Sequence, residues 1–156
     1  MKRIWQLIGM WTWEGIQSLL GAIVCLFLTG KKNGGLFKGR RVIWFKKGKF
    51  FSGTSLGYFI LLPYDAGVKT TAHEHGHCKQ SRDWGPLYIP VCGIDSLRNN
   101  LRARKIQWTY ENYYHLWPED DADKRGGIVW INDVRVYNGK CVTYHHVNGI
   151  LVYQSK

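Results

Sequence analysis

Residues 66–82 read A-G-V-K-T-T-A-H-E-H-G-H-C-K-Q-S-R, a stretch without proline that a Gly-Pro pair follows at 85–86. This pattern predicts one helix over residues 66–82. His73 and His77 are four residues apart, so both imidazoles project from the same face of that helix. Gly76 lies between them and costs a helix about 1 kcal/mol relative to alanine. We therefore expect another element to pack closely against Gly76.

The same helix carries the H-E-x-x-H pattern at residues 73–77. Two imidazoles on one helix face can bind a single metal ion, and this pattern predicts Zn²⁺ with His73 and His77 as ligands. Glu74 lies one residue further round the helix, where it can act on metal-bound water without binding the ion. Zinc lowers the pKa of that water towards neutrality. We therefore expect Glu74 to be the general base when this water attacks a peptide carbonyl.

A third ligand is expected, because catalytic zinc usually has three protein ligands and one open position. Residues 118–127 read P-E-D-D-A-D-K-R-G-G. Glu119 and Asp123 are four residues apart and share a helix face, with the small Ala122 between them. An alternative is that these acids only favour the positive end of a helix dipole. Beside an upstream H-E-x-x-H, the metal interpretation is favoured.

Together, H-E-x-x-H and E-x-x-A-D resemble the gluzincin zinc peptidases, in particular the membrane-bound Ste24 and HtpX enzymes. The string at residues 73–81 also resembles small bacterial and phage proteins that carry H-E-x-G-H-x-x-Q-S. The resemblance implies that Glu119 is the third zinc ligand. It further implies that Asp123 hydrogen-bonds His73 and so fixes the tautomer of that imidazole.

The gluzincin resemblance also implies where a peptide substrate would bind. Gluzincins commonly bind substrate as an extra strand beside an edge strand upstream of the metal helix. The candidate is Phe51–Leu62, in which Gly53 and Gly57 would allow another backbone to approach closely. A His or Tyr near the metal often stabilises the oxyanion, and the favoured candidates are Tyr114 and His115, followed by Tyr113 and Tyr88.

Other residues remain candidates for the third ligand. Asp83 stands where a metzincin pattern has its last ligand, but Gln80 replaces the glycine that this pattern needs. His115 and the pair at 145–146 are further candidates, although a histidine in an aromatic-rich strand is more often structural. His75 lies on the other side of its helix from the histidine pair, so we expect it to face solvent or the substrate.

The basic residues of the chain are unevenly distributed. The formal net charge is +11, and the first fifty residues hold ten Lys or Arg and a single acid, Glu14. These basic residues flank an apolar segment at 4–28, which as one helix is long enough for a bilayer core of about 30 Å. Its first half is amphipathic, with Gln6, Glu14, Gln17 and Ser18 near one face.

We therefore expect residues 1–30 to be a membrane-associated helix, either interfacial or spanning. The alternative is a buried helix that covers a sheet or a partner. No small-residue cleavage site follows the apolar run, so a cleaved signal peptide is not expected. The predicted location is membrane-associated or cytoplasmic.

Residues 31–156 are expected to form an α+β domain with a minigluzincin-like core. Its parts are a short antiparallel sheet, the metal helix, the acid-bearing helix and a C-terminal β-hairpin. Residues 31–39 indicate a turn-rich connector. Alternating apolar residues predict strands at 41–45, 50–62, 128–137 and 141–153. Turns are expected at 46–49, 138–139 and 148–149.

The favoured function is hydrolysis of peptide bonds in a peptide or protein substrate. One alternative is a membrane-associated interaction protein whose zinc site is structural and is closed by a fourth ligand, His75 or Asp123. Another is a nucleic-acid-binding accessory protein, which the charge of +11 allows.

Overall fold

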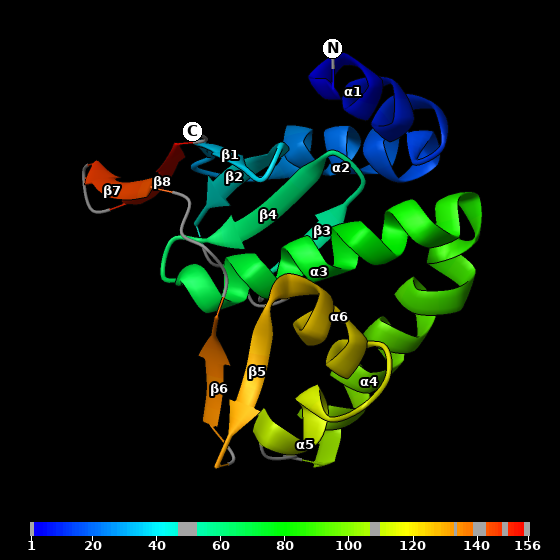
Figure 1. Cartoon of the computed structure of the whole chain (residues 1–156), viewed down its shortest axis with the longest axis vertical. Helices are drawn as coiled ribbons and strands as arrows, with labels where there is room; N and C mark the ends of the chain where they lie inside the picture. Colours follow the sequence, from blue (N-terminus) through cyan, green and yellow to red (C-terminus); the bar gives the residue numbers. More distant parts are fainter. Residues whose placement is uncertain are drawn as a thin grey trace.

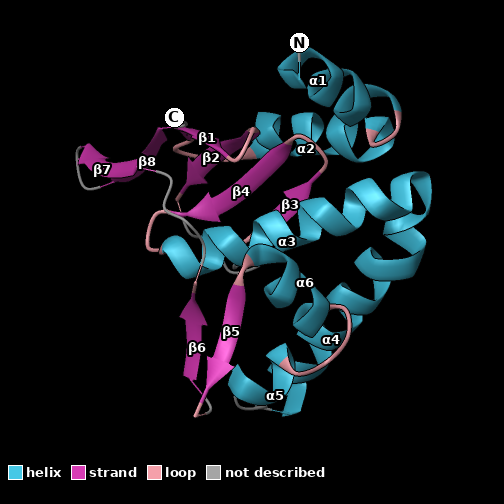
Figure 2. Ribbon diagram, viewed as in Figure 1, coloured by secondary structure: helices cyan, strands magenta, loops and turns pink. Residues whose placement is uncertain are grey.

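A computed structural model describes residues 2–46, 53–106, 110–132, 134–138, 143–147 and 150–154. It confirms the predicted α+β class, with a mixed sheet, a separate β-hairpin and several helices (Figure 1, Figure 2). The helices are α1 (Lys2–Thr12), α2 (Gly15–Phe27), α3 (Val68–Trp84), α4 (Ile94–Ile106), α5 (Tyr110–Tyr114) and α6 (Glu119–Gly126). Two short helical turns, η1 (Gly85–Leu87) and η2 (Ile89–Gly93), connect α3 to α4.

The strands form two sheets. Their bounds are β1 (Lys32–Phe37), β2 (Arg40–Phe45), β3 (Thr54–Leu56), β4 (Phe59–Pro63), β5 (Ile128–Ile131), β6 (Val134–Tyr137), β7 (Thr143–Val147) and β8 (Ile150–Gln154). The larger sheet has the order β3-β4-β2-β1-β8-β7, and β5 pairs with β6. Because β2 and β4 run parallel, the expectation of a purely antiparallel sheet is wrong.

Two further expectations about the sheet are wrong. The predicted connector at 31–39 contains β1, which pairs with β2 through a tight turn at Lys38 and Gly39, where φ is 48° and 85°. The predicted single strand at 50–62 is divided into β3 and β4 by a turn at Gly57, where φ is 56°. A Cβ atom at Gly57 would also overlap Ser18 of α2, so close packing fixes this turn.

The C-terminal part folds as two hairpins. The predicted strand at 128–137 bends back at Asn132, whose φ is 47°, to give β5 and β6. The expected C-terminal hairpin is confirmed as the antiparallel pair β7 and β8. Residues 47–52, 139–142 and 148–149, which hold most of the predicted turns, lie outside the described residues.

The N-terminal segment is two helices, so the prediction of one continuous helix is wrong. The chain bends between α1 and α2 at Glu14, whose carboxylate is buried and accepts a hydrogen bond of 2.8 Å from the Arg40 guanidinium. The polar face of α2 points inwards: the Ser18 hydroxyl donates to the Met10 carbonyl, and Gln17 donates to the Gly85 carbonyl. Within the described residues, no helix is both long and apolar enough to cross a membrane.

The core lies between the larger sheet and α3. Buried apolar side chains of the sheet pack against Ala72 and Cys78 of α3; they are Phe37, Val42, Trp44, Ile60 and Leu62. The opposite side of α3 is covered by α6 (Figure 2). This arrangement fixes α3 between the sheet, whose edge strand β3 is nearby, and the acid-bearing helix.

Candidate metal centre

The centre depends on the close approach of α3 and α6. A Cβ atom at Gly76 would overlap the carbonyl oxygen of Ala122, and one at Gly126 would overlap that of Ala72. The expectation that another element packs against Gly76 is therefore confirmed, and that element is α6. This contact places Glu119, the first residue of α6, over the histidine face of α3.

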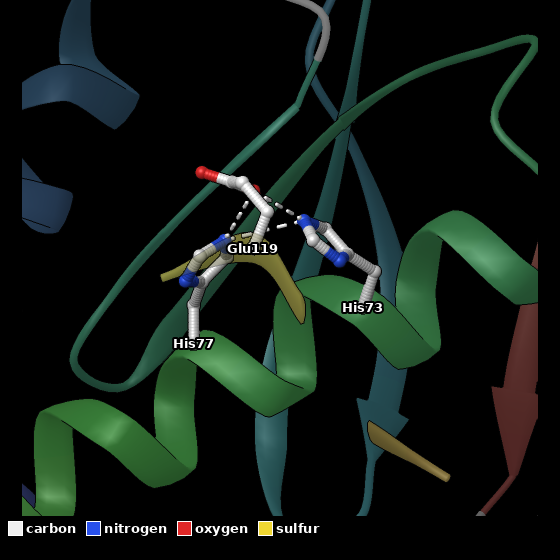
Figure 3. A group of neighbouring side chains, drawn as sticks. All are labelled: His73, His77 and Glu119. Carbon is white, nitrogen blue, oxygen red and sulfur yellow. Dashed lines mark hydrogen bonds and ion pairs between the residues drawn. The ribbon is translucent and has the colours of Figure 1, made fainter. Parts of the chain in front are cut away.

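Three buried side chains converge at this crossing (Figure 3). Glu119 Oε2 lies 3.1 Å from His73 Nε2 and 3.3 Å from His77 Nε2. The two Nε2 atoms are 3.2 Å apart. His73, His77 and Glu119 thus present three potential ligand atoms to one point, and this group could hold a metal ion.

The tautomer of His73 follows from its other ring nitrogen. Nδ1 lies 2.7 Å from Asp123 Oδ1. Burial opposes ionisation of Asp123, but hydrogen bonds with His73 and Arg135 lower its pKa, so this carboxylate only accepts. Arg135 Nε donates to Asp123 Oδ2 at 2.7 Å. His73 Nδ1 is therefore the donor, and in the neutral ring the lone pair is on Nε2.

The same reasoning applies to His77. Its Nδ1 lies 2.8 Å from Gln80 Oε1. The amide nitrogen of Gln80 donates to the Pro118 carbonyl and to Asp121, each at 2.8 Å, so the amide oxygen must accept from His77. The neutral imidazole consequently directs the lone pair of Nε2 towards Glu119.

Two nitrogen lone pairs and a carboxylate oxygen therefore face one another, which is stable only around a positive charge. The directions of the pKa shifts agree with this need for a positive charge. Burial disfavours the imidazolium of His73, yet hydrogen bonds with Asp123 and Glu119 raise its pKa to about 9. Burial also opposes ionisation of Glu119, but His77 and His73 lower its pKa. The site attracts a cation, whether a proton or a metal ion.

Glu74 lies beside this group in a cavity of about 510 Å³, whose lining also includes His73, His77 and Glu119. Glu74 is buried, and burial raises its pKa despite the opposing effect of the two histidines. A Cβ atom at Gly53 would lie 3.0 Å from Glu74 Oε1. The lack of a side chain at Gly53 therefore leaves room beside this carboxylate.

The cavity runs along β3. Its lining includes residues 53–56 on one side and the aromatic residues Tyr88, Tyr113 and Tyr114 elsewhere. Tyr114 contacts His73 edge-on, with ring centroids 5.0 Å apart. The Arg135 guanidinium lies over the Tyr114 ring, 3.4 Å from the ring centroid.

The other predicted site residues lie elsewhere. His115 is exposed and stacks on Trp130 at 4.2 Å, so it is not at the cavity. Asp83 pairs with Arg125. The expectation that His75 faces solvent or substrate is wrong: it is buried against Phe37, and burial and nearby cations lower its pKa to about 3. His145 and His146 are on β7, but their side chains lie outside what the structure describes.

Two residues of the centre were not predicted as site residues. Gln80 is three positions after His77, so helix spacing alone places both on one face, and this signal could have found it. Arg135 comes from β6, and nothing in the local sequence links it to Asp123. Comparisons with protein families, curated proteins and solved structures give no match to the chain.

Proposed function

We propose that the protein is a zinc-dependent peptidase in which His73, His77 and Glu119 bind the ion. The observation that carries this proposal is the triangle of ligand atoms, with sides of 3.1, 3.2 and 3.3 Å. Tetrahedral zinc with ligand bonds of 2.0–2.1 Å separates its ligand atoms by about 3.3 Å. The ligand set of two imidazoles and one carboxylate is also that of many zinc peptidases.

An open fourth position favours catalysis over a structural role. Among the described residues, the potential metal-binding group consists of three side chains and no more. The two candidates for a fourth ligand are otherwise engaged, since His75 packs on Phe37 and Asp123 binds His73 and Arg135. The three side chains of the group would hold the ion and would leave a fourth position for water or a substrate oxygen, as catalytic zinc requires.

When bound, zinc would polarise the substrate carbonyl and lower the pKa of its water ligand. The Glu74 carboxylate would accept a proton from the attacking water and would pass it to the amine nitrogen as the C–N bond breaks. Burial raises the pKa of Glu74 in the metal-free protein, and a raised pKa favours acceptance of a proton. Tyr114, Tyr113 and Tyr88 are the hydroxyl candidates for stabilising the oxyanion, since all three line the cavity.

The substrate backbone would lie along β3. This strand is at one end of the sheet order and pairs only with β4 among the described strands. Its residues line the cavity next to Glu74. An extended peptide added at this edge would pass the metal group, with Gly53 allowing close approach.

The test is a Glu74→Gln variant assayed for zinc content and for cleavage of a fluorescent casein substrate and a mixed peptide library. The amide has the same shape but cannot accept the proton, so we expect zinc content to be kept and hydrolysis to fall by roughly a hundredfold or more. Asp120→Asn, at a half-exposed acid paired with Lys124, is the matched control and should keep full activity. Full activity in Glu74→Gln, or cleavage that survives removal of zinc, would contradict the proposal.

A further inference from the structure

Helices α1 and α2 expose apolar side chains to solvent, which is the reverse of an ordinary surface helix. In α2 the buried residues are Gln17, Ser18 and Gly21, while apolar side chains face outwards. The exposed apolar residues of the two helices are Ile4, Ile8, Trp11, Ile16, Leu19, Leu20, Ile23, Leu26 and Phe27. Many apolar side chains exposed on two helices that pack together mark an interaction site.

A second apolar surface lies on α4. Ile94, Leu97 and Leu101 are exposed at spacings of three and four, so they form one stripe along the helix. The exposed basic residues of the same helix lie next to this stripe, at Arg98, Arg102 and Lys105. Its one acid is Asp95, so this face is apolar and basic together.

The two surfaces meet at the mouth of the metal cavity. Leu20 of α2 lines the cavity from one side, and Ile94 and Leu97 of α4 line it from the other. We name the exposed apolar residues of α1, α2 and α4, with the basic residues of α4, the docking face. The cavity therefore opens within the docking face.

We propose that the docking face binds the surface of an anionic lipid bilayer, so that the metal cavity opens towards the membrane. Apolar side chains beside Lys and Arg are the combination that seats a helix at a bilayer interface. The helix α2 has 13 residues and spans about 20 Å, whereas a bilayer core is about 30 Å thick. The helices therefore lie on the membrane rather than crossing it.

Charge favours a bilayer over a second copy of the chain. A symmetric dimer would place the same surface of each copy in contact. The interface would then contain the basic residues of both α4 helices, with Asp95 of each helix as their only acid, and this excess of positive charge opposes association. An anionic headgroup layer instead attracts each of these residues.

The first experiment measures co-sedimentation of the full chain with phosphatidylcholine vesicles that contain phosphatidylglycerol. The variant Leu19→Glu/Leu101→Glu places a charge in each apolar surface, where the side chains are 58% and 57% exposed. The matched control is Ile131→Glu/Val134→Glu on the β5–β6 hairpin, where exposure is 54% and 57% (Figure 1). We expect the first variant to lose roughly tenfold or more of its partitioning and the control to match the wild type.

The second experiment tests the electrostatic part with Arg98→Gln/Lys105→Gln. Binding to vesicles with phosphatidylglycerol should weaken by roughly tenfold, and binding to pure phosphatidylcholine vesicles should change little. Added salt should weaken the wild type in the same way. Circular dichroism and zinc content of each variant establish that the fold is kept.

Several outcomes would overturn the proposal. Equal loss of binding in the two Glu double variants would show that the docking face has no special role. A lipid-free dimer that Leu19→Glu/Leu101→Glu dissociates would assign the face to a second copy. Salt-dependent binding to duplex DNA without binding to vesicles would assign it to a nucleic acid. None of these readouts depends on peptidase activity.

Discussion

At the scale of single residues, the candidate metal centre depends on groups beside its three potential ligands. Asp123 accepts from His73 Nδ1 at 2.7 Å, and Arg135 holds Asp123 in place. The amide oxygen of Gln80 accepts a hydrogen bond from His77 Nδ1. These contacts set both tautomers, so each imidazole in its neutral form presents a lone pair to the metal position.

We therefore predict that Asp123→Asn weakens zinc binding by roughly 10- to 100-fold, because the amide no longer fixes the donor at His73 Nδ1. Competition titration with a chromophoric chelator measures the affinity. The control is Asp83→Asn, an acid whose partner is Arg125 outside the cavity. An unchanged zinc affinity in Asp123→Asn would show that this hydrogen bond does not orient the ligand.

Zinc binding should also depend on pH. The pKa of His73 is raised to about 9, so in the metal-free protein this imidazole carries a proton at neutral pH. Zinc must displace that proton. The apparent affinity for zinc should therefore increase as the pH rises towards about 9, and it should decrease as the pH is lowered from that value. Calorimetry in buffers of different ionisation enthalpy measures proton release, and binding without release would contradict the prediction.

At the scale of elements, the crossing of α3 and α6 brings the ligands together. We predict that Gly76→Ala destabilises the protein by about 1–3 kcal/mol and weakens zinc binding, because the methyl group would overlap the Ala122 carbonyl and push α6 away. The control is Gly9→Ala in α1, where no atom outside the neighbouring helix backbone lies within 4 Å of the added Cβ. That change should be neutral or stabilising by up to about 1 kcal/mol. Urea unfolding compares the two, and equal effects would refute the role of the crossing.

The N-terminal helices should be integral to the fold, since Glu14 between them is buried against Arg40. We predict that Glu14→Gln lowers the free energy of unfolding by roughly 3–5 kcal/mol, because it leaves a buried guanidinium without its counter-charge. Asp120→Asn breaks the exposed pair with Lys124 and should cost at most about 1 kcal/mol. A small loss in Glu14→Gln, measured by urea unfolding, would mean that these helices are only loosely attached.

Part of this architecture could be predicted from the sequence because it is local. Helix spacing is sufficient to pair His73 with His77 and Glu119 with Asp123, and Gly76 indicates a close crossing. Periodicity identifies which residues of α2 share a face, but not which face is buried. The inward direction of the polar face depends on distant partners, namely the carbonyls of Met10 and Gly85. The strand β1 was missed because Gly34 and Gly35 are typical of a turn.

At the scale of the whole molecule, the metal group, the edge strand and the docking face meet at one cavity. The walls of this cavity come from α2, β3, α3, η2, α4, α5 and α6. A site assembled from so many elements follows from the complete fold, and this is why the sequence could indicate its ligands but not its setting. The hydrolytic water, the added substrate strand and the lipid surface would all approach from the open side of that cavity.

The central claim is that His73, His77 and Glu119 bind zinc and leave one position open. X-ray absorption at the zinc edge of the purified protein tests it most directly. We predict one zinc per chain with only nitrogen and oxygen neighbours at about 2.0–2.1 Å, including two imidazoles. The absence of stoichiometric zinc, or a sulfur neighbour at about 2.3 Å from Cys78 or Cys92, would contradict the account.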